Sequence, residues 1–247
     1  MNLTERSLKF EIFDFMELVD LPLKDYEDDH NDWFENEFGE EERYALGEMV
    51  DYQDPTQYEL IWQTHESMRR FFWPLSASTL LSLPHLIEQD IVRGNVIDIG
   101  SGMGFAACFM AWKWRDCHVT AVELSANGNI RAREMAKRAG LHNITFVEGA
   151  LQQFPRSHEF DLVTSFLTAH EVGCLDELHD EIYGDESHSD EFARINLEEY
   201  QSDYAQFVGD LLNDQGSIFS LERLGGMAEQ CAWIGGLRNS GVFIDLE

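Results

Sequence analysis

A short apolar run that ends in an acidic residue and three closely spaced glycines constrains this fold more than any other feature. The run is Val96–Ile99 with Asp98 inside it, and Gly100, Gly102 and Gly104 follow before a helical pattern begins. Glycines at a strand-to-helix turn allow positive φ angles and let a ligand approach the main chain closely. The sequence therefore predicts a strand, a turn that holds a nucleotide-like cofactor, and a helix, in that order.

The residues around the glycines discriminate between cofactors. A dinucleotide fingerprint has glycine or alanine at its sixth position, where this chain has Phe105. A phosphate-binding loop would end in Gly-Lys-Ser/Thr, which is absent here. The carboxylate of Asp98 would repel a pyrophosphate, whereas it suits a cofactor that carries an ammonium group. The turn is therefore typical of neither dinucleotide nor triphosphate binding.

A second acidic residue follows at a suitable distance. The segment His118–Val122 reads as a strand, and Glu123 comes directly after it, nineteen residues past Gly104. A carboxylate at that strand end can accept hydrogen bonds from both hydroxyls of a ribose. With these two motifs the chain resembles the class I S-adenosyl-L-methionine (SAM)-dependent methyltransferases.

The resemblance implies a cofactor and the residues that bind it. The cofactor is SAM, the product is S-adenosyl-L-homocysteine (SAH), and no metal site is implied. The family commonly has Gly-Asp after its third strand, but this chain has Gly149–Ala150, so Gln152, Gln153 or the Leu151 amide would have to bind adenine. The implied cofactor-binding residues are Asp98, Gly100, Ser101, Gly102, Gly104, Glu123, Leu124, Gly149, Ala150, Leu151 and Ser165.

Further strand patterns extend the alternation along the chain. Residues Asn143–Glu148, Phe160–Phe166 and Gly216–Leu221 read as strands, with helix-length segments between them. This order predicts an α/β fold with a doubly wound, mainly parallel, Rossmann-like methyltransferase sheet. Only a helix at Met227–Leu237 and one strand at Gly241–Ile244 follow, so the closing antiparallel hairpin usual in the family is incomplete in this sequence.

Two parts of the chain are expected. Residues 1–92 form an acidic, aromatic, mostly helical N-terminal extension that serves as a lid or a dimerisation arm. Residues 93–247 form the SAM-binding core, with an acidic insertion after strand four at residues 173–198. In the extension, one helix is predicted from Tyr58 to Trp73, ended by Pro74, and another over 76–86. Its aromatic residues read as core, with a substrate-lining role as the alternative for Trp62, Phe72 or Trp73.

The acidic residues are concentrated in two segments. The net charge is −30, yet residues 94–165 hold seven acidic and seven basic side chains. Residues 1–60 hold 19 acidic and 4 basic, and residues 166–212 hold 13 and 1. An acidic lid would attract cations and repel phosphates, which argues against a nucleic-acid substrate. The alternatives are a solvated acidic surface, a site for a basic partner, or a divalent ion.

Catalysis of methyl transfer mainly needs proximity and alignment, with a base where the acceptor must lose a proton. His170, just past strand four, is the candidate base, and Glu171 is the candidate to orient it or to hold a cation. The alternative is that His170 caps the following helix. The Asn/Asp-Pro-Pro-aromatic motif of nucleic-acid amino methyltransferases is replaced by Ser165-Phe166-Leu167-Thr168.

The resemblance and the charge together predict a SAM-dependent methyltransferase that acts on a small-molecule or cationic acceptor, at oxygen or nitrogen. The alternatives are a protein lysine or arginine methyltransferase with a basic partner, and a non-catalytic SAM-fold binding module. We expect a small-molecule or basic-peptide substrate, no nucleic acid, no membrane association and a possible homodimer. The four cysteines lack paired spacing, and no secretory or spanning segment is evident, so a cytoplasmic location is expected.

Overall fold

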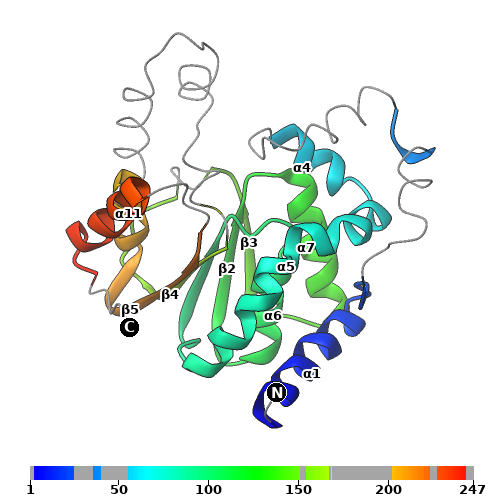
Figure 1. Cartoon of the computed structure of the whole chain (residues 1–247), viewed down its shortest axis with the longest axis horizontal. Helices are drawn as coiled ribbons and strands as arrows, with labels where there is room; N and C mark the ends of the chain where they lie inside the picture. The colour runs from blue at the N-terminus through cyan, green and yellow to red at the C-terminus, as the bar shows by residue number, and fades with distance from the viewer. Residues whose placement is uncertain are drawn as a thin grey trace.

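A computed structural model describes residues 3–24, 36–39, 55–150, 154–166, 168, 202–222 and 227–242. After a helical N-terminal part, strands and helices alternate from β1 to β3, and β4, β5 and α11 complete the described elements (Figure 1). The elements are α1 (Leu3–Leu18), α4 (Pro55–Ile61), α5 (His65–Gln89), β1 (Asn95–Ile99), α6 (Phe105–Lys113), β2 (His118–Glu123), α7 (Ala126–Arg138), β3 (Ile144–Glu148), β4 (Phe160–Phe166), β5 (Leu212–Leu221) and α11 (Met227–Asn239).

The five strands form one sheet in the order β3-β2-β1-β4-β5, and every neighbouring pair is parallel. The register pairs Ile99 with Val122 on one side and with Ser165 on the other. The carboxyl ends of β1, β2 and β4 therefore lie side by side. This arrangement confirms the predicted doubly wound parallel sheet, with the order reversing next to β1.

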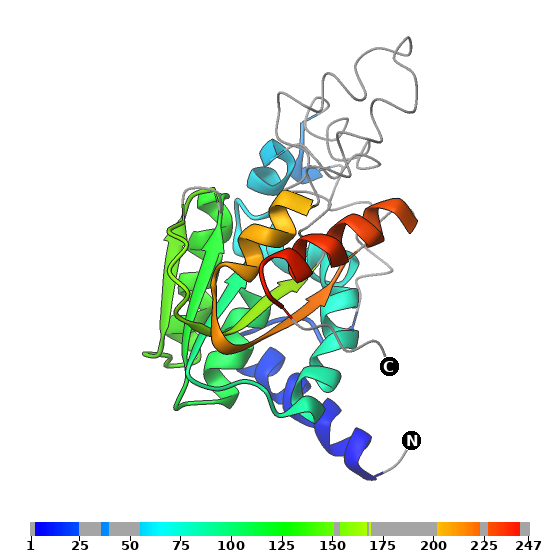
Figure 2. The ribbon, with the colours of Figure 1, turned by 90° about the vertical axis from the view of Figure 1, so that its left-hand side faces the viewer.

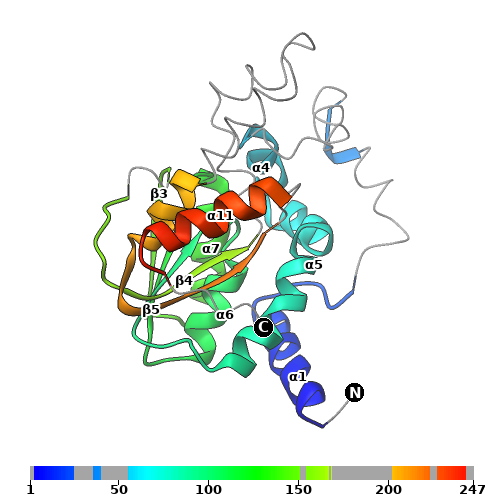
Figure 3. The same ribbon diagram turned by 60° about the vertical axis from the view of Figure 1, so that its left-hand side comes forward.

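Helices cover both faces of the sheet because successive strand residues point to opposite sides. Val96, Val119 and Leu162 pack against α1, α5, α6 and α7 on one face. Ile97 and Val163 pack against α11 and the helical segment 202–209 on the other. Figure 2 shows α11 in front of the sheet, and Figure 3 shows α5 and α6 on its far side.

The prediction that Pro74 ends a helix is wrong. The break lies earlier, after Ile61, and α5 then runs from His65 through both Pro74 and Pro84 to Gln89. A proline inside a helix costs about 3 kcal/mol, because a hydrogen bond is lost and the ring crowds the preceding turn. The helix continues because its buried side chains on both sides of Pro74 belong to the same core, namely Met68, Phe71, Phe72, Leu83 and Leu86.

The N-terminal extension and the sheet share one hydrophobic core. Phe15 of α1 is fully buried, and its ring centroid lies 5.9 Å from that of Phe105, 5.6 Å from Phe109 and 5.4 Å from Trp112. All three partners belong to α6, the helix that follows the glycine turn. The extension therefore supports the helix that begins at the predicted cofactor site.

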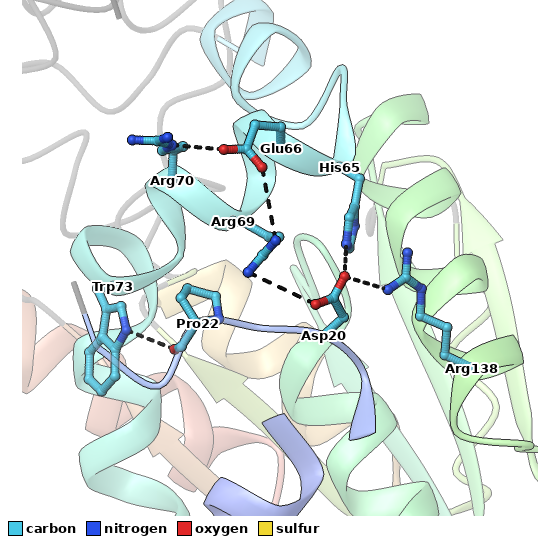
Figure 4. A network of polar contacts seen from close by, with 8 residues as sticks. All are labelled: Asp20, Pro22, His65, Glu66, Arg69, Arg70, Trp73 and Arg138. Carbon is cyan, nitrogen blue, oxygen red and sulfur yellow. Dashed lines mark hydrogen bonds and ion pairs between the residues drawn. The ribbon is translucent and has the colours of Figure 1, made fainter. Parts of the chain in front are cut away.

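A polar cluster fastens the end of α1 to α5 and α7 (Figure 4). Asp20 Oδ2 accepts hydrogen bonds from His65 Nε2 at 3.0 Å and from Arg138 Nη1 at 2.9 Å. Arg69 Nη2 lies 3.9 Å from the other carboxylate oxygen of Asp20. Nearby, the Trp73 indole donates to the Pro22 carbonyl at 2.9 Å. We call Asp20, His65, Arg69 and Arg138 the Asp20 clasp.

Two further segments predicted from the sequence lie wholly or partly outside the described residues. The acidic insertion at 173–198 lies outside the described residues. The strand expected at Gly241–Ile244 is not formed at Gly241 or Val242, and the rest of it lies outside the description. Within the described ranges, no helix has the length and apolar character needed to cross a membrane.

Candidate cofactor and acceptor site

The three glycines of the turn after β1 all have positive φ angles, as the sequence predicts for Gly100, Gly102 and Gly104. Gly104, with φ 79°, is the N-cap of α6, and a Cβ atom there would lie 2.4 Å from Cβ of Ala132 in α7. Glycine at this position therefore allows the two helices to approach each other. The Ser101 amide donates to the Val122 carbonyl at 3.0 Å, which fixes the turn against the end of β2.

Glu123, at the end of β2, connects the turns that follow β1, β2 and β3. Its carboxylate accepts from the Gly102 amide at 2.7 Å and from the Ser125 amide at 2.8 Å. Its backbone carbonyl accepts from the Gly149 amide at 3.1 Å. Burial raises the pKa of Glu123, hydrogen bonds from Ser125, Gly102 and Leu124 lower it, and the Glu59 charge raises it. Oε2 accepts from the Gly102 amide and Oε1 from the Ser125 amide, and a carboxylate has further lone pairs that can accept from ribose hydroxyls.

Asp98 is a buried carboxylate at the end of β1, with only 1% of its surface exposed. Its Oδ1 accepts from the Thr164 hydroxyl at 2.6 Å, whereas Oδ2 has no hydrogen-bond partner among the described residues. Desolvation raises the pKa of Asp98 to about 7, the Thr164 hydroxyl and the Ala107 amide lower it, and Glu123 raises it. A cation bound beside Asp98 would relieve this cost, since it favours the ionised carboxyl.

Two residues of the extension, Glu59 and Trp62, contact the glycine turn and the start of α7. Glu59 Oε2 accepts from the Asn127 amide in the first turn of α7 at 3.1 Å, and the Glu59 carbonyl accepts from Asn127 Nδ2 at 2.9 Å. The Trp62 indole lies against Gly102 and Gly128. Sequence reasoning missed Glu59 and assigned Trp62 to the core or a substrate pocket. No periodic pattern indicates these contacts, because Glu59 and Asn127 are 68 positions apart and Trp62 and Gly102 are 40 positions apart.

A second polar cluster lies where β4 and β5 end, beyond the cofactor turns. Ser165 and Ser220 are register partners, and both hydroxyls donate to Oε1 of Glu222, the Ser220 bond being 2.9 Å long. Sequence reasoning assigned Ser165 to the cofactor and missed Glu222. The available signal was an acidic residue directly after a predicted strand, as in Glu123.

The other predicted site residues divide into two groups. Leu124 follows Glu123 and is 56% exposed, so its side chain is open to a ligand. Gly149 and Ala150 follow β3, next to the end of β2. Leu151, His170 and Glu171 lie outside the described residues, as do Gln152 and Gln153. The assignments of His170 as base and Glu171 as its partner stay predictions.

The site has the features of one class of α/β domain. Such domains bind an adenosine-containing cofactor at a topological switch point of the sheet. They typically have a glycine turn after the first strand and an acidic residue after the second, as this chain does. The orphaned Oδ2 of Asp98 and the remaining lone pairs of Glu123 fit a ligand with an ammonium group and ribose hydroxyls. SAM has both.

Comparison with known proteins identifies a domain within the chain. Residues 96–184 match a family model described as a methyltransferase domain. This segment is therefore a methyltransferase domain, and the parallel sheet and the glycine turn agree with the predicted class I SAM-dependent type. SAM is the methyl donor of this family, so the predicted cofactor is confirmed at the level of the domain.

The similar proteins differ in their acceptors. The release factor glutamine methyltransferase of Yersinia pestis is 33% identical over 108 residues, covering 39% of each chain. The sarcosine/dimethylglycine N-methyltransferase of Halorhodospira halochloris is 36% identical over 92 residues, covering 36% of this chain and 33% of that protein. This chain thus spans well under half the length of these relatives.

A solved structure of a SAM-dependent methyltransferase from Thiobacillus denitrificans, in complex with SAH, has a TM-score of 0.37 to this chain at 16% identity. It covers 52% of this chain and 41% of the other. This similarity is too low to support any conclusion about ligand or reaction.

Proposed function

We propose that this protein transfers a methyl group from SAM to the nitrogen of a small amine. The observation that carries the acceptor class is Glu222, whose carboxylate stands between two serine hydroxyls at the ends of β4 and β5. A carboxylate with adjoining hydroxyls suits a protonated amine. Its partner Ser165 lies on β4, which pairs with β1, the strand that precedes the glycine turn. The surplus of acidic residues in 1–60 and 166–212 would also attract a cation.

The transfer forms a carbon–nitrogen bond on the acceptor and breaks the carbon–sulfur bond of the donor, leaving a neutral thioether. The amine must lose a proton before or during this step, and the proposed base is His170. The chain's own contribution is to bind, align and shield the two reactants. The N-methyltransferase relatives named for glycine, sarcosine and dimethylglycine support an amine acceptor, whereas basic peptides and peptide glutamine are the competing acceptors.

The test has two stages on the full chain. Calorimetric titration first measures SAH affinity, and isotope-labelled SAM is then offered with glycine, sarcosine, dimethylglycine, polyamines, basic peptides or a glutamine-containing peptide. We expect labelled product with a small amine, detected by mass spectrometry. Transfer to peptides alone would contradict the small-amine acceptor. SAH binding without transfer to any acceptor would favour the binding-module alternative.

Glu222→Gln isolates the acceptor site. We expect kcat/KM for the amine to fall about 10- to 100-fold, because hydrogen bonds to charged groups contribute about 1.5–3 kcal/mol. SAH affinity should stay unchanged. Glu148→Gln is the matched control, since Glu148 is an exposed acidic residue at the end of β3, and it should leave kcat/KM unaltered. Equal effects of the two substitutions would reduce the role of Glu222 to general surface charge.

His170→Ala separates chemistry from binding. If His170 is the base, the variant loses turnover near neutral pH while SAH affinity is retained. Part of the turnover should return at high pH, where the amine acceptor is already deprotonated in solution. Unchanged turnover would contradict the assignment.

A further inference from the structure

The inference concerns Trp62, the last aromatic residue before α5. Only 6% of its surface is exposed, and its indole Nε1 has no hydrogen-bond partner among the described residues. A buried donor without an acceptor costs free energy, and tryptophan usually places its N–H against a partner when it is buried. Such a group in a folded protein calls for an explanation, and an acceptor on a bound ligand is the one that its position supports.

The position of Trp62 shows which ligand that acceptor belongs to. A Cβ atom at Gly102 would lie 3.2 Å from Cη2 and 3.3 Å from Cζ2 of the indole. A Cβ atom at Gly128 would lie 2.9 Å from Cε3. The ring therefore covers the glycine turn and the start of α7, and the atoms that face Gly102 include Cζ2, which is on the Nε1 side of the ring.

Neighbouring contacts hold the indole in this place. The Tyr58 ring stacks on it with centroids 4.9 Å apart and an angle of 23° between the planes. Glu59, between them in sequence, is bonded to Asn127 of α7 through its carboxylate and its carbonyl. The indole ring is thus held against the cofactor turn by contacts with residues of α4, with its N–H buried and unpaired among the described residues.

We propose that the Trp62 indole N–H donates a hydrogen bond to the α-carboxylate of SAM, which makes the N-terminal extension part of the cofactor site. This proposal rests on the proposed function, because it needs SAM to be the ligand. The carboxylate is the strongest acceptor of the cofactor, and the charged groups around the turn, Asp98, Glu123 and Glu59, would repel it. A neutral indole donor supplies the contact that these carboxylates cannot. The ribose hydroxyls are themselves donors and have Glu123 as acceptor.

Trp62→Phe tests the proposal because it keeps an aromatic ring and removes the N–H. We expect SAH affinity, measured by calorimetry, to fall about 10-fold, within a range of about 5- to 100-fold. Affinity for 5′-methylthioadenosine, which lacks the amino-acid part, should stay within about twofold of the unmodified protein. The SAH-induced change in tryptophan fluorescence should also be largely lost.

Trp73→Phe is the matched control, because the Trp73 indole is satisfied by the Pro22 carbonyl within the same extension. It should lower the melting temperature and leave SAH affinity and the fluorescence change in place. If Trp62→Phe binds SAH as the unmodified protein does, the proposal is wrong although the proposed function stands. A parallel loss of 5′-methylthioadenosine affinity would overturn the carboxylate assignment. Failure of the unmodified protein to bind SAH would overturn both proposals.

Discussion

Asp98 and Glu123 end neighbouring strands, yet the protein surrounds their carboxylates differently. Both oxygens of Glu123 accept backbone amides, so this side chain already organises the turns before any ligand arrives. The fully buried Asp98 carboxylate accepts from the Thr164 hydroxyl and is also stabilised by the Ala107 amide, but its Oδ2 has no partner within hydrogen-bond distance among the described residues. Glu123 is therefore a structural and a binding residue, whereas the Asp98 carboxylate gains its full set of partners only with a cationic ligand.

The raised pKa of Asp98 predicts how cofactor binding depends on pH. With a pKa of about 7, the free protein holds this proton at pH 6 and has released most of it at pH 8. A bound ammonium group favours the ionised form, so at pH 6 binding must also expel the proton. We expect SAH affinity to be about tenfold weaker at pH 6 than at pH 8, with proton release at the lower pH. Calorimetry in buffers of different ionisation heat measures both quantities.

The Asp98→Asn variant is the control for this prediction. Its SAH affinity should be weak and should not change between pH 6 and 8.

The pKa of Asp98 also predicts how the free energy of unfolding depends on pH. The unfolded chain ionises Asp98 near pH 3.8, while the folded chain holds the proton up to about pH 7. The contribution of Asp98 to stability therefore falls as pH rises from about 4 to 7, and the variant escapes that loss. A pH-independent SAH affinity in the unmodified protein would contradict the role of Asp98.

At the scale of elements, the N-caps decide where the helices around the site begin. Thr64 Oγ1 accepts from the Ser67 amide at 3.0 Å and starts α5, and Ser125 Oγ accepts from the Gly128 amide at 2.9 Å and starts α7. The two caps are chemically alike but lie in different surroundings. Only the Ser125 cap adjoins the cofactor turn, through the hydrogen bond between its amide and Glu123.

This difference predicts two outcomes for one kind of substitution. Thr64→Ala and Ser125→Ala should each lower stability by about 1 kcal/mol. In a chain of this length that corresponds to a melting temperature about 2–4 °C lower. Only Ser125→Ala should also weaken SAH binding, because a displaced start of α7 moves the amides that hold Glu123. Scanning fluorimetry and SAH titration on both variants check this, and equal losses of SAH affinity would refute it.

For the molecule as a whole, the extension and the sheet depend on each other. The expected boundary at residues 92 and 93 divides the sequence, yet Phe15 on one side packs against three rings of α6 on the other. Phe15→Ala should cost about 3–5 kcal/mol, as for other buried aromatic residues. The melting temperature should fall by about 6–20 °C while unfolding stays a single calorimetric transition. Phe13→Ala, at a position 38% exposed on the same helix, should change stability much less. Two separate transitions would contradict a shared core.

The Asp20 clasp gives a smaller, salt-sensitive contribution. Asp20 is about half exposed, so Asp20→Asn should cost at most about 1 kcal/mol at pH 7. Hydrogen bonds from His65 and then Arg138 lower the pKa of Asp20. The contribution of the clasp is therefore present above pH 3.8 and is lost as the pH falls through the lowered pKa. Denaturant titrations should show the difference between the two proteins shrinking toward pH 3 and in about 1 M salt. If the stability difference between the two proteins persists at pH 3 and in about 1 M salt, the effect of Asp20→Asn comes from packing and not from charge.

The parallel sheet and the cofactor turn were predictable from the sequence, because both depend on local patterns. Each pattern involves residues close together in the sequence: the strand period, the glycine spacing and the acidic residue at each strand end. The strand ends then meet at one edge of the parallel sheet. Tertiary structure decided the helix boundary near Pro74, where burial on both sides outweighs the cost of a proline. It also placed Trp62 and Glu59 over Gly102 and Asn127, and Glu222 beside Ser165. These contacts join residues 40 or more positions apart, so no local pattern encodes them, and only the packed fold brings them together.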